Sequence, residues 1–245
     1  WETKASNSLL VNGEGQKKRN WDSRGKIVNF KTTDYAHYAL GDATEAYFGL
    51  VNRFFRHALF LRPVASGDEP VIILYDDVTS QSLSSFDWLL HSLEKMQVDE
   101  QNKTIIIRLG EAGLLVQFLT PESLRFYQSD KFTAPPEAEN MPDQWHLNAQ
   151  TVAPDSVARF VTVLMPFRNG FEEKLPRLKY IDKSGWVIIE LTSNSTRQVV
   201  AFRTDAKAGT SIKIGEFRTK ADIAATAFDL QGKVMASIEI KNTTP

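Results

Sequence analysis

Short runs that alternate between apolar and polar residues recur along the whole chain. In the run from 34 to 41, DYAHYALG, successive side chains fall on opposite faces, as they do in a β-strand. Further strand-length runs follow at intervals of about 8–12 residues, with turn-forming residues between them. The pattern is plainest in the last third of the chain, in the runs 177–181, 185–191, 197–204, 211–214, 221–229 and 233–240. The pattern therefore predicts an all-β protein built around a large antiparallel β-sandwich.

Two runs depart from simple alternation. Residues 42–52 are compatible with a helix, because Ala43, Ala46 and Tyr47 fall at helical spacing. Residues 86–96 are ambiguous between a helix and a strand. The Pro-rich stretch 133–142 has no periodicity and is expected to be a loop.

A continuous apolar run, VIILY, covers residues 71–75 and predicts a strand buried on both faces. Asp76 and Asp77 follow it directly, and we expect them to form a turn that ends the strand. They are not expected to act as a catalytic pair, because neighbouring side chains on a strand point to opposite faces.

The length of 245 residues allows one large β domain or two smaller ones. We expect the sandwich to occupy residues 1–166. A smaller C-terminal β layer or domain, residues 167–245, is expected to pack on it.

Composition and charge exclude several classes of site and partner. The sequence contains no cysteine, so neither disulfides nor thiolate metal sites are available. Its net charge of −1 provides no overall field that favours nucleic acid. No apolar run approaches the ~20 residues that a membrane-spanning helix needs.

Three of the four histidines fall between residues 35 and 91. His57 lies in a strongly apolar run and is expected to be packed in the core. His91 follows Trp88-Leu89-Leu90, which places it at the edge of a core, where a metal ligand could be held rigidly. No self-sufficient catalytic motif of the hydrolase, metalloprotease or dinucleotide-binding type occurs in the sequence.

Several ordered motifs resemble those of heparinase II/III-like polysaccharide lyases. The stretch SNSLLVNGEGQ, residues 6–16, is similar to a family segment of the form His-Asn-Thr, three apolar residues, then Asp-Gly-x-Gly-Gln. The similarity continues through YALGDATEAY, RFFRHALFLRP, VIILYDDV, FDWLLH, QWHLNA and RFVTVLMP. It spans residues 3–166.

This resemblance implies an antiparallel β-sandwich that an N-terminal α/α toroid precedes in the parent protein. Such lyases cleave acidic, uronate-containing polysaccharides, for example heparan sulfate or alginate, by β-elimination. Their base and acid come largely from the toroid, so no catalytic residue is assigned in this chain. The resemblance further implies a bacterial, periplasmic or secreted protein.

The resemblance also implies a structural zinc or other divalent metal, bound by two histidines and one aspartate near the cleft. His91 matches one histidine, and Asp22 is the candidate aspartate. The other histidine is expected before Asn7, where this sequence has Ser6. One histidine and one aspartate fall short of the four ligands that structural zinc takes.

For an acidic polysaccharide, Lys17, Lys18, Arg19 and Arg24 are the candidate binding residues, because cations bind carboxylates and sulfates. The expected partners are therefore the polysaccharide and the toroid of the same parent chain, with no nucleic acid. The alternative is a free-standing carbohydrate-binding or structural β module. A toroid encoded upstream of Trp1 would favour the lyase over that module.

Overall fold

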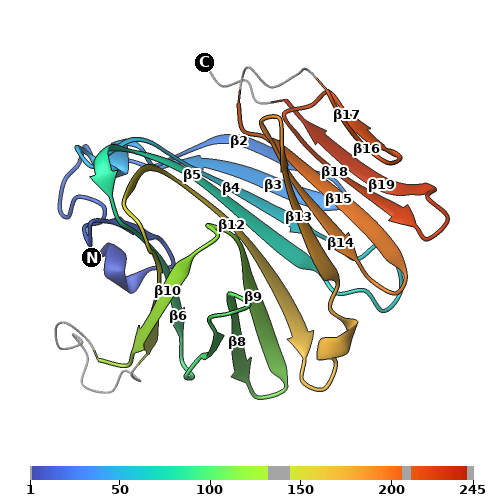
Figure 1. Cartoon of the computed structure of the whole chain (residues 1–245), viewed down its shortest axis with the longest axis horizontal. Coiled ribbons are helices and arrows are strands. Elements are labelled where there is room, and N and C mark those ends of the chain that lie inside the picture. Colours follow the sequence, from blue (N-terminus) through green and yellow to red (C-terminus); the bar gives the residue numbers. More distant parts are fainter. Residues whose placement is uncertain (1, 132–143, 206–210, 242–245) are drawn as a thin grey trace. The chain divides into compact units, whose positions relative to one another are not determined.

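The computed structural model describes residues 2–131, 144–205 and 211–241, and β-strands make up most of them (Figure 1). The only helical elements in these ranges are three single turns of 3₁₀-helix, η1 (Thr3–Ala5), η2 (Glu45–Tyr47) and η3 (Glu172–Lys174). This confirms the all-β prediction. The loop predicted at 133–142 lies outside the described residues.

One compact unit comprises residues 1–27, 40–58 and 73–169. It contains a four-stranded antiparallel sheet with the order β1-β6-β11-β10. The bounds of these strands are β1 (Leu9–Val11), β6 (Phe86–Ser92), β11 (Trp145–Thr151) and β10 (Leu124–Ser129).

A second sheet has eight strands in the order β2-β3-β4-β5-β12-β9-β8-β7. The bounds are β2 (Lys26–Thr32), β3 (Ala36–Asp42), β4 (Val51–Leu61), β5 (Val71–Ser84), β12 (Asp155–Arg168), β9 (Ala112–Thr120), β8 (Thr104–Leu109) and β7 (Gln97–Asp99). The pairs β12–β9, β9–β8 and β8–β7 are antiparallel, with a bulge in the first at Val161 and Thr162.

The hydrophobic core of this unit takes side chains from both sheets, which makes the unit a β-sandwich. Trp88 on β6 packs edge-on against Phe118 on β9, with ring centroids 5.1 Å apart. Both rings are almost fully buried, as the alternating apolar positions predicted. The other large core side chains come from both sheets and include Phe54, Phe86, Phe126, Leu147 and Phe160.

The other compact unit comprises residues 28–39, 59–72 and 170–245, so the division between the units passes through β2 to β5. It contains a five-stranded antiparallel sheet and a two-stranded hairpin. The sheet runs β13 (Arg177–Lys183), β14 (Trp186–Thr192), β15 (Thr196–Arg203), β18 (Ile223–Asp229) and β19 (Val234–Ile240), and the hairpin is β16 (Ile212–Ile214) and β17 (Phe217–Thr219). Trp186, Phe217 and Phe228 form the centre of its core. A domain boundary near residue 166 stays a prediction.

The turn expected at Asp76 and Asp77 is wrong. β5 continues through both residues to Ser84, and both carboxylates are buried. Each is paired with an arginine of β4: Arg56 Nε lies 2.6 Å from Asp76 Oδ1, and Arg53 Nη2 lies 2.8 Å from Asp77 Oδ2. These pairs offset the cost of burying the charges, so the strand does not have to end.

The helix considered for residues 42–52 is also wrong. Only the single turn η2 forms, and β4 begins at Val51. The helical path ends at Phe48, whose ψ of 119° lies outside the helical region, and Gly49 continues the turn with a φ of +80°. Ala46 and Tyr47 are nevertheless buried, so their apolar spacing reflects packing against the sandwich core. Within the ambiguous run 86–96, strand β6 forms from Phe86 to Ser92, and residues 93–96 lie outside it.

Candidate functional site

The basic loop Lys17–Ser23 is closed at both ends on a single carbonyl oxygen. Ala46 O accepts a hydrogen bond from Lys17 N at 3.1 Å and another from Ser23 Oγ at 3.0 Å. Inside the loop, Asn20 accepts hydrogen bonds through its backbone oxygen from Ser23 N, 3.1 Å, and through Oδ1 from Asp22 N, 2.8 Å. The loop is therefore held in one shape against η2, although its side chains face solvent.

The N-terminal segment lies against this loop. Thr3 Oγ1 accepts a hydrogen bond from Gln16 N at 2.7 Å, and the Glu2 carboxylate forms an ion pair with Lys18 Nζ. Gly15 permits the close approach, because a Cβ atom there would lie 2.3 Å from Thr3 Cβ. The glycine-rich stretch thus brings Glu2 and Lys18, which are distant in sequence, into contact.

A hollow of about 720 Å³ lies between the loop and the N-terminal segment. This volume is within the usual range of ligand pockets, roughly 300–1,000 Å³. One part of the lining comes from the loop, namely Lys17, Lys18, Arg19, Asn20, Trp21 and Ser23. The N-terminal segment contributes Glu2, Thr3, Ala5 and Ser6, and Gln16 joins the two. Three cations and one carboxylate therefore face the hollow, so its charge favours an anionic ligand.

A second hollow of about 480 Å³ adjoins the same segment and is lined in part by Lys17, Glu14 and Phe48. The Lys17 ammonium group lies over the Phe48 ring, 4.9 Å from its centroid. This cation–π contact gives the flexible lysine side chain a preferred position between the two hollows.

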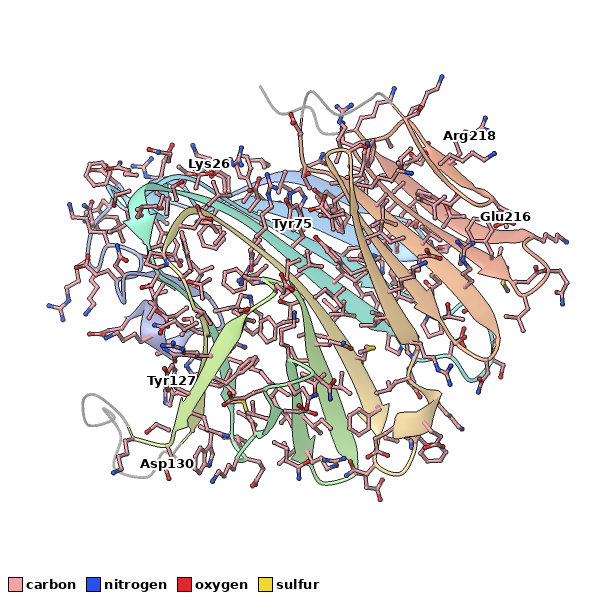
Figure 2. All side chains as sticks on the ribbon, in the orientation of Figure 1. Lys26, Tyr75, Tyr127, Asp130, Glu216 and Arg218 are labelled. Atoms are coloured by element: carbon pink, nitrogen blue, oxygen red, sulfur yellow. The ribbon has the colours of Figure 1, made fainter. Side chains whose placement is uncertain are left out.

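The structure brings three of the four predicted polysaccharide-binding residues together at one hollow: Lys17, Lys18 and Arg19. Arg24 is exposed but does not line it. Its Nε donates a hydrogen bond to Trp21 O at 2.9 Å, so Arg24 supports the loop from outside. Figure 2 shows Lys26, the next cation along the chain, at the periphery of the unit, where its Nζ pairs with Glu45 Oε1 at 2.8 Å.

His91 is held by hydrogen bonds to the N-terminal segment. Its Nδ1 lies 3.0 Å from Asn7 Oδ1, and its Nε2 lies 2.8 Å from Lys4 O. The His91 ring also packs edge-on against the ring of His146 on β11, with ring centroids 4.6 Å apart. Partial burial lowers the pKa of His91, which favours the neutral ring, so only one of the two ring nitrogens donates a hydrogen bond at a time.

The predicted metal ligands are not assembled into a site in this structure. Both ring nitrogens of His91 face oxygen acceptors, and Asp22 lies in the basic loop, where its backbone N–H bonds to Asn20. Within the described ranges, no group of three or more His, Cys, Asp or Glu residues lies close enough together to hold a metal ion. The described residues thus show no assembled group of zinc ligands, and metal binding by His91 and Asp22 stays a prediction.

A buried network anchors the N-terminal segment to the sandwich. Arg56 forms two hydrogen bonds to the Asp76 carboxylate and donates a third from Nη1 to Asn7 O, 2.8 Å away. Trp88 Nε1 also donates to Asp76 Oδ2 at 3.1 Å. Sequence reasoning missed this network because it treated Asp76 as a turn residue. The network fixes the position of Asn7, and through it the segment that lines the hollow.

Comparisons with known proteins show a similarity to this chain in the fold alone. No family model and no curated protein matches the sequence. Among solved structures, heparan sulfate lyase HepC from Pedobacter heparinus superposes with a TM-score of 0.63 at 12% identity, over 85% of this chain and 32% of that one. The chain has the fold of a portion of heparinase III. A structure of a heparinase III gene product matches with a TM-score of 0.60 at 12% identity. The match covers 82% of this chain and 30% of the heparinase III chain.

A further structure of heparinase III matches with a TM-score of 0.57 and 11% identity, over 80% of this chain and 29% of that one. The chain thus spans about a third of the length of the heparinase III structures it matches. None of the described helices is long and apolar enough to cross a membrane.

Proposed function

We propose that this chain is the β-sandwich portion of a polysaccharide lyase that cleaves acidic, uronate-containing polysaccharide by β-elimination. In this proposal it lines the substrate cleft, while an α/α toroid of the same parent chain carries the main catalytic residues. The likeness of its fold to a portion of heparinase III supports the assignment. The observation that carries it is the hollow beside the loop Lys17–Ser23, where three cations face a single carboxylate.

The three cations suit the chemistry of an acidic sugar chain. Lys17, Lys18 and Arg19 can each form a charge-assisted hydrogen bond with a carboxylate or sulfate oxygen. Neutralising a uronate carboxylate in this way also favours removal of the neighbouring C5 proton, which is the first requirement of β-elimination. The loop would therefore bind the substrate and assist a base supplied from elsewhere.

The residues that line the hollow suit a chain that binds the substrate while another part of the parent protein supplies the catalytic residues. Among the described residues that line it, neither histidine nor tyrosine occurs, and these are the side chains that serve as base and acid in the lyases that the sequence resembles. The same observation supports the alternative function, a carbohydrate-binding module without catalysis. Both functions place an acidic polysaccharide in the hollow, and a periplasmic or secreted location accords with either.

The binding step is tested with the triple variant Lys17→Gln/Lys18→Gln/Arg19→Gln. Calorimetric titration with a heparan sulfate oligosaccharide should show affinity about three- to 150-fold lower than wild type, because three exposed charge contacts of roughly 0.2–1 kcal/mol each are lost.

The matched control removes the same number of lysines and arginines from exposed positions of the other unit, as Lys183→Gln/Lys213→Gln/Arg218→Gln. Figure 2 shows Arg218 on the outside of the β16–β17 hairpin. This control should retain nearly full affinity. Equal affinity of the wild type and the loop variant would contradict the proposed function.

A further inference from the structure

Trp21 is unusually exposed for a tryptophan. Its side chain lies at the hollow and is 92% exposed. The two tryptophans of the cores, Trp88 and Trp186, are each about 1% exposed. In the part of the chain that the structure describes, the Trp21 ring packs on no other aromatic ring or cation. One exposed apolar side chain is ordinary by itself, but Trp21 lines the hollow in which three cations lie, and this combination sets it apart.

The backbone around Trp21 is fixed even though its side chain is not packed. The loop Lys17–Ser23 is tied at both ends to Ala46 O, and the carbonyl of Trp21 itself accepts a hydrogen bond from Arg24 Nε. Arg19, two residues before Trp21, has a φ of +50°, which turns the chain sharply inside the loop. A loop held in this way presents the indole at a defined place and lowers the entropic cost of binding.

We propose that Trp21 stacks on the face of a pyranose ring whose carboxylate or sulfate is bound by Lys18 or Arg19. This inference rests on the proposed function and adds to it a residue that determines specificity. A sugar ring has an apolar face of C–H groups and a polar rim. The hollow has the matching combination, an exposed indole next to cations in the same lining.

The proposal distinguishes this site from a general anion-binding surface. Lysine and arginine attract any polyanion through charge, with little regard to what lies between the charges. Stacking requires a ring with an apolar face, so Trp21 should add affinity for an anionic sugar and none for a polyanion without sugar rings. An acidic protein segment would also use the cations, but its binding would not depend on a flat ring at position 21.

The test compares Trp21→Ala and Trp21→Phe with the wild type on two ligands, a heparan sulfate oligosaccharide and inorganic polyphosphate. Replacement by alanine should lower affinity for the oligosaccharide about five- to tenfold, the usual size of a lost aromatic stacking contact. Replacement by phenylalanine should retain most of the affinity. Affinity for polyphosphate should stay unchanged in both variants.

Tryptophan fluorescence is a second measurement of the contact between Trp21 and the sugar ring. Trp88 and Trp186 are buried, Trp145 is partly buried, and Trp1 lies outside the described residues, so a change in emission is assigned to Trp21 where it is lost in Trp21→Phe. Addition of the oligosaccharide should shift wild-type emission to shorter wavelength, and this shift should be absent from Trp21→Phe. Polyphosphate should cause no shift.

The possible outcomes separate this inference from the proposed function. If Trp21→Ala binds the oligosaccharide as tightly as wild type while the triple basic variant loses affinity, the stacking proposal is overturned and the proposed function stands. If Trp21→Ala weakens both ligands equally, the residue supports the loop and does not touch sugar. If neither Trp21→Ala nor the triple basic variant changes oligosaccharide affinity, both proposals fail.

Discussion

Glu2 is the single acid that faces the three cations of the hollow, and it is already paired with Lys18. The pairing lowers the pKa of Glu2, so the side chain is ionised near neutral pH. In the proposed function, an anionic sugar that binds Lys18 competes with this carboxylate for the ammonium group.

Replacement of Glu2 by glutamine should raise affinity for a heparan sulfate oligosaccharide about two- to fivefold, because Lys18 loses its competing partner. Calorimetric titration measures the change. Glu14→Gln is the matched control, since it removes the same charge from a position that lines the neighbouring hollow. An equal gain in both variants would show that net charge, and not the Glu2–Lys18 pair, controls affinity.

His57 on β4 is buried against Tyr75, with ring centroids 5.2 Å apart, as its apolar surroundings predicted. Figure 2 shows Tyr75 among the strands of the sheet. Burial lowers the pKa of His57 from an ordinary value of 6.5 to about 3. Below pH 6.5 the unfolded chain binds a proton at this residue and the folded chain does not, so folding becomes less favourable as pH falls.

Between pH 6 and 5, where the unfolded chain is mostly protonated at this residue, His57 should lower the free energy of unfolding by about 1.2 kcal/mol. His57→Phe keeps an aromatic ring against Tyr75 and removes the titration, so its unfolding free energy should fall less steeply over this range. Urea unfolding at a series of pH values measures both slopes. Parallel slopes in the two proteins would mean that His57 is protonated in the folded state.

At the scale of elements, β9 and β12 approach closely at Gly113. The two strands pair so that Gly113 faces Phe167, and a Cβ atom at Gly113 would lie 2.2 Å from Phe167 Cζ. The Phe167 ring thus occupies the space that any larger residue would need. The position requires glycine because of packing and not because of an unusual backbone conformation.

Gly113→Ala should destabilise the protein by about 1–3 kcal/mol, the usual cost of overpacking. Phe167→Ala should cost about 3–5 kcal/mol through the cavity it leaves. The double variant should be clearly more stable than the sum of the two losses, because the cavity accommodates the added methyl group. Additive losses in urea unfolding would show that the two side chains do not compete for space.

The elements were largely predictable from sequence because side-chain alternation is a local property of a strand. The prediction failed where a distant partner decides the outcome. Asp76 and Asp77 continue β5 because Arg56 and Arg53 on β4 pair with them, and no local pattern shows that pairing. Residues 42–52 had helical spacing, but the helical path ends after one turn at Phe48, just before Gly49 with its φ of +80°.

The candidate site was predictable only where its residues are neighbours in sequence. Lys17, Lys18 and Arg19 meet at one hollow because a single closed loop carries them. Glu2 is brought to Lys18 by a hydrogen bond between distant segments, which a single sequence does not show. Trp21 had one sequence signal, a large aromatic residue within a strongly polar stretch, KKRNWDSRG.

At the scale of the whole molecule, the proposed role is to bind substrate while the catalytic base lies elsewhere. A base must come within about 3 Å of the C5 proton, or act through one water molecule. This chain alone should therefore produce no unsaturated uronate from heparan sulfate, heparin or alginate. Absorbance of the new double bond measures the product, and a steady rise with purified chain would place an active site within these residues.

The central claim is that an acidic polysaccharide binds at the loop Lys17–Ser23, and amide hydrogen exchange tests it most directly. Exchange is measured with and without a saturating heparan sulfate oligosaccharide. The oligosaccharide should slow exchange in the segments 2–6 and 17–23, leave β13 and β14 unchanged, and have no effect on the triple basic variant. Slower exchange confined to segments outside the hollow, with 17–23 unchanged, would contradict the claim.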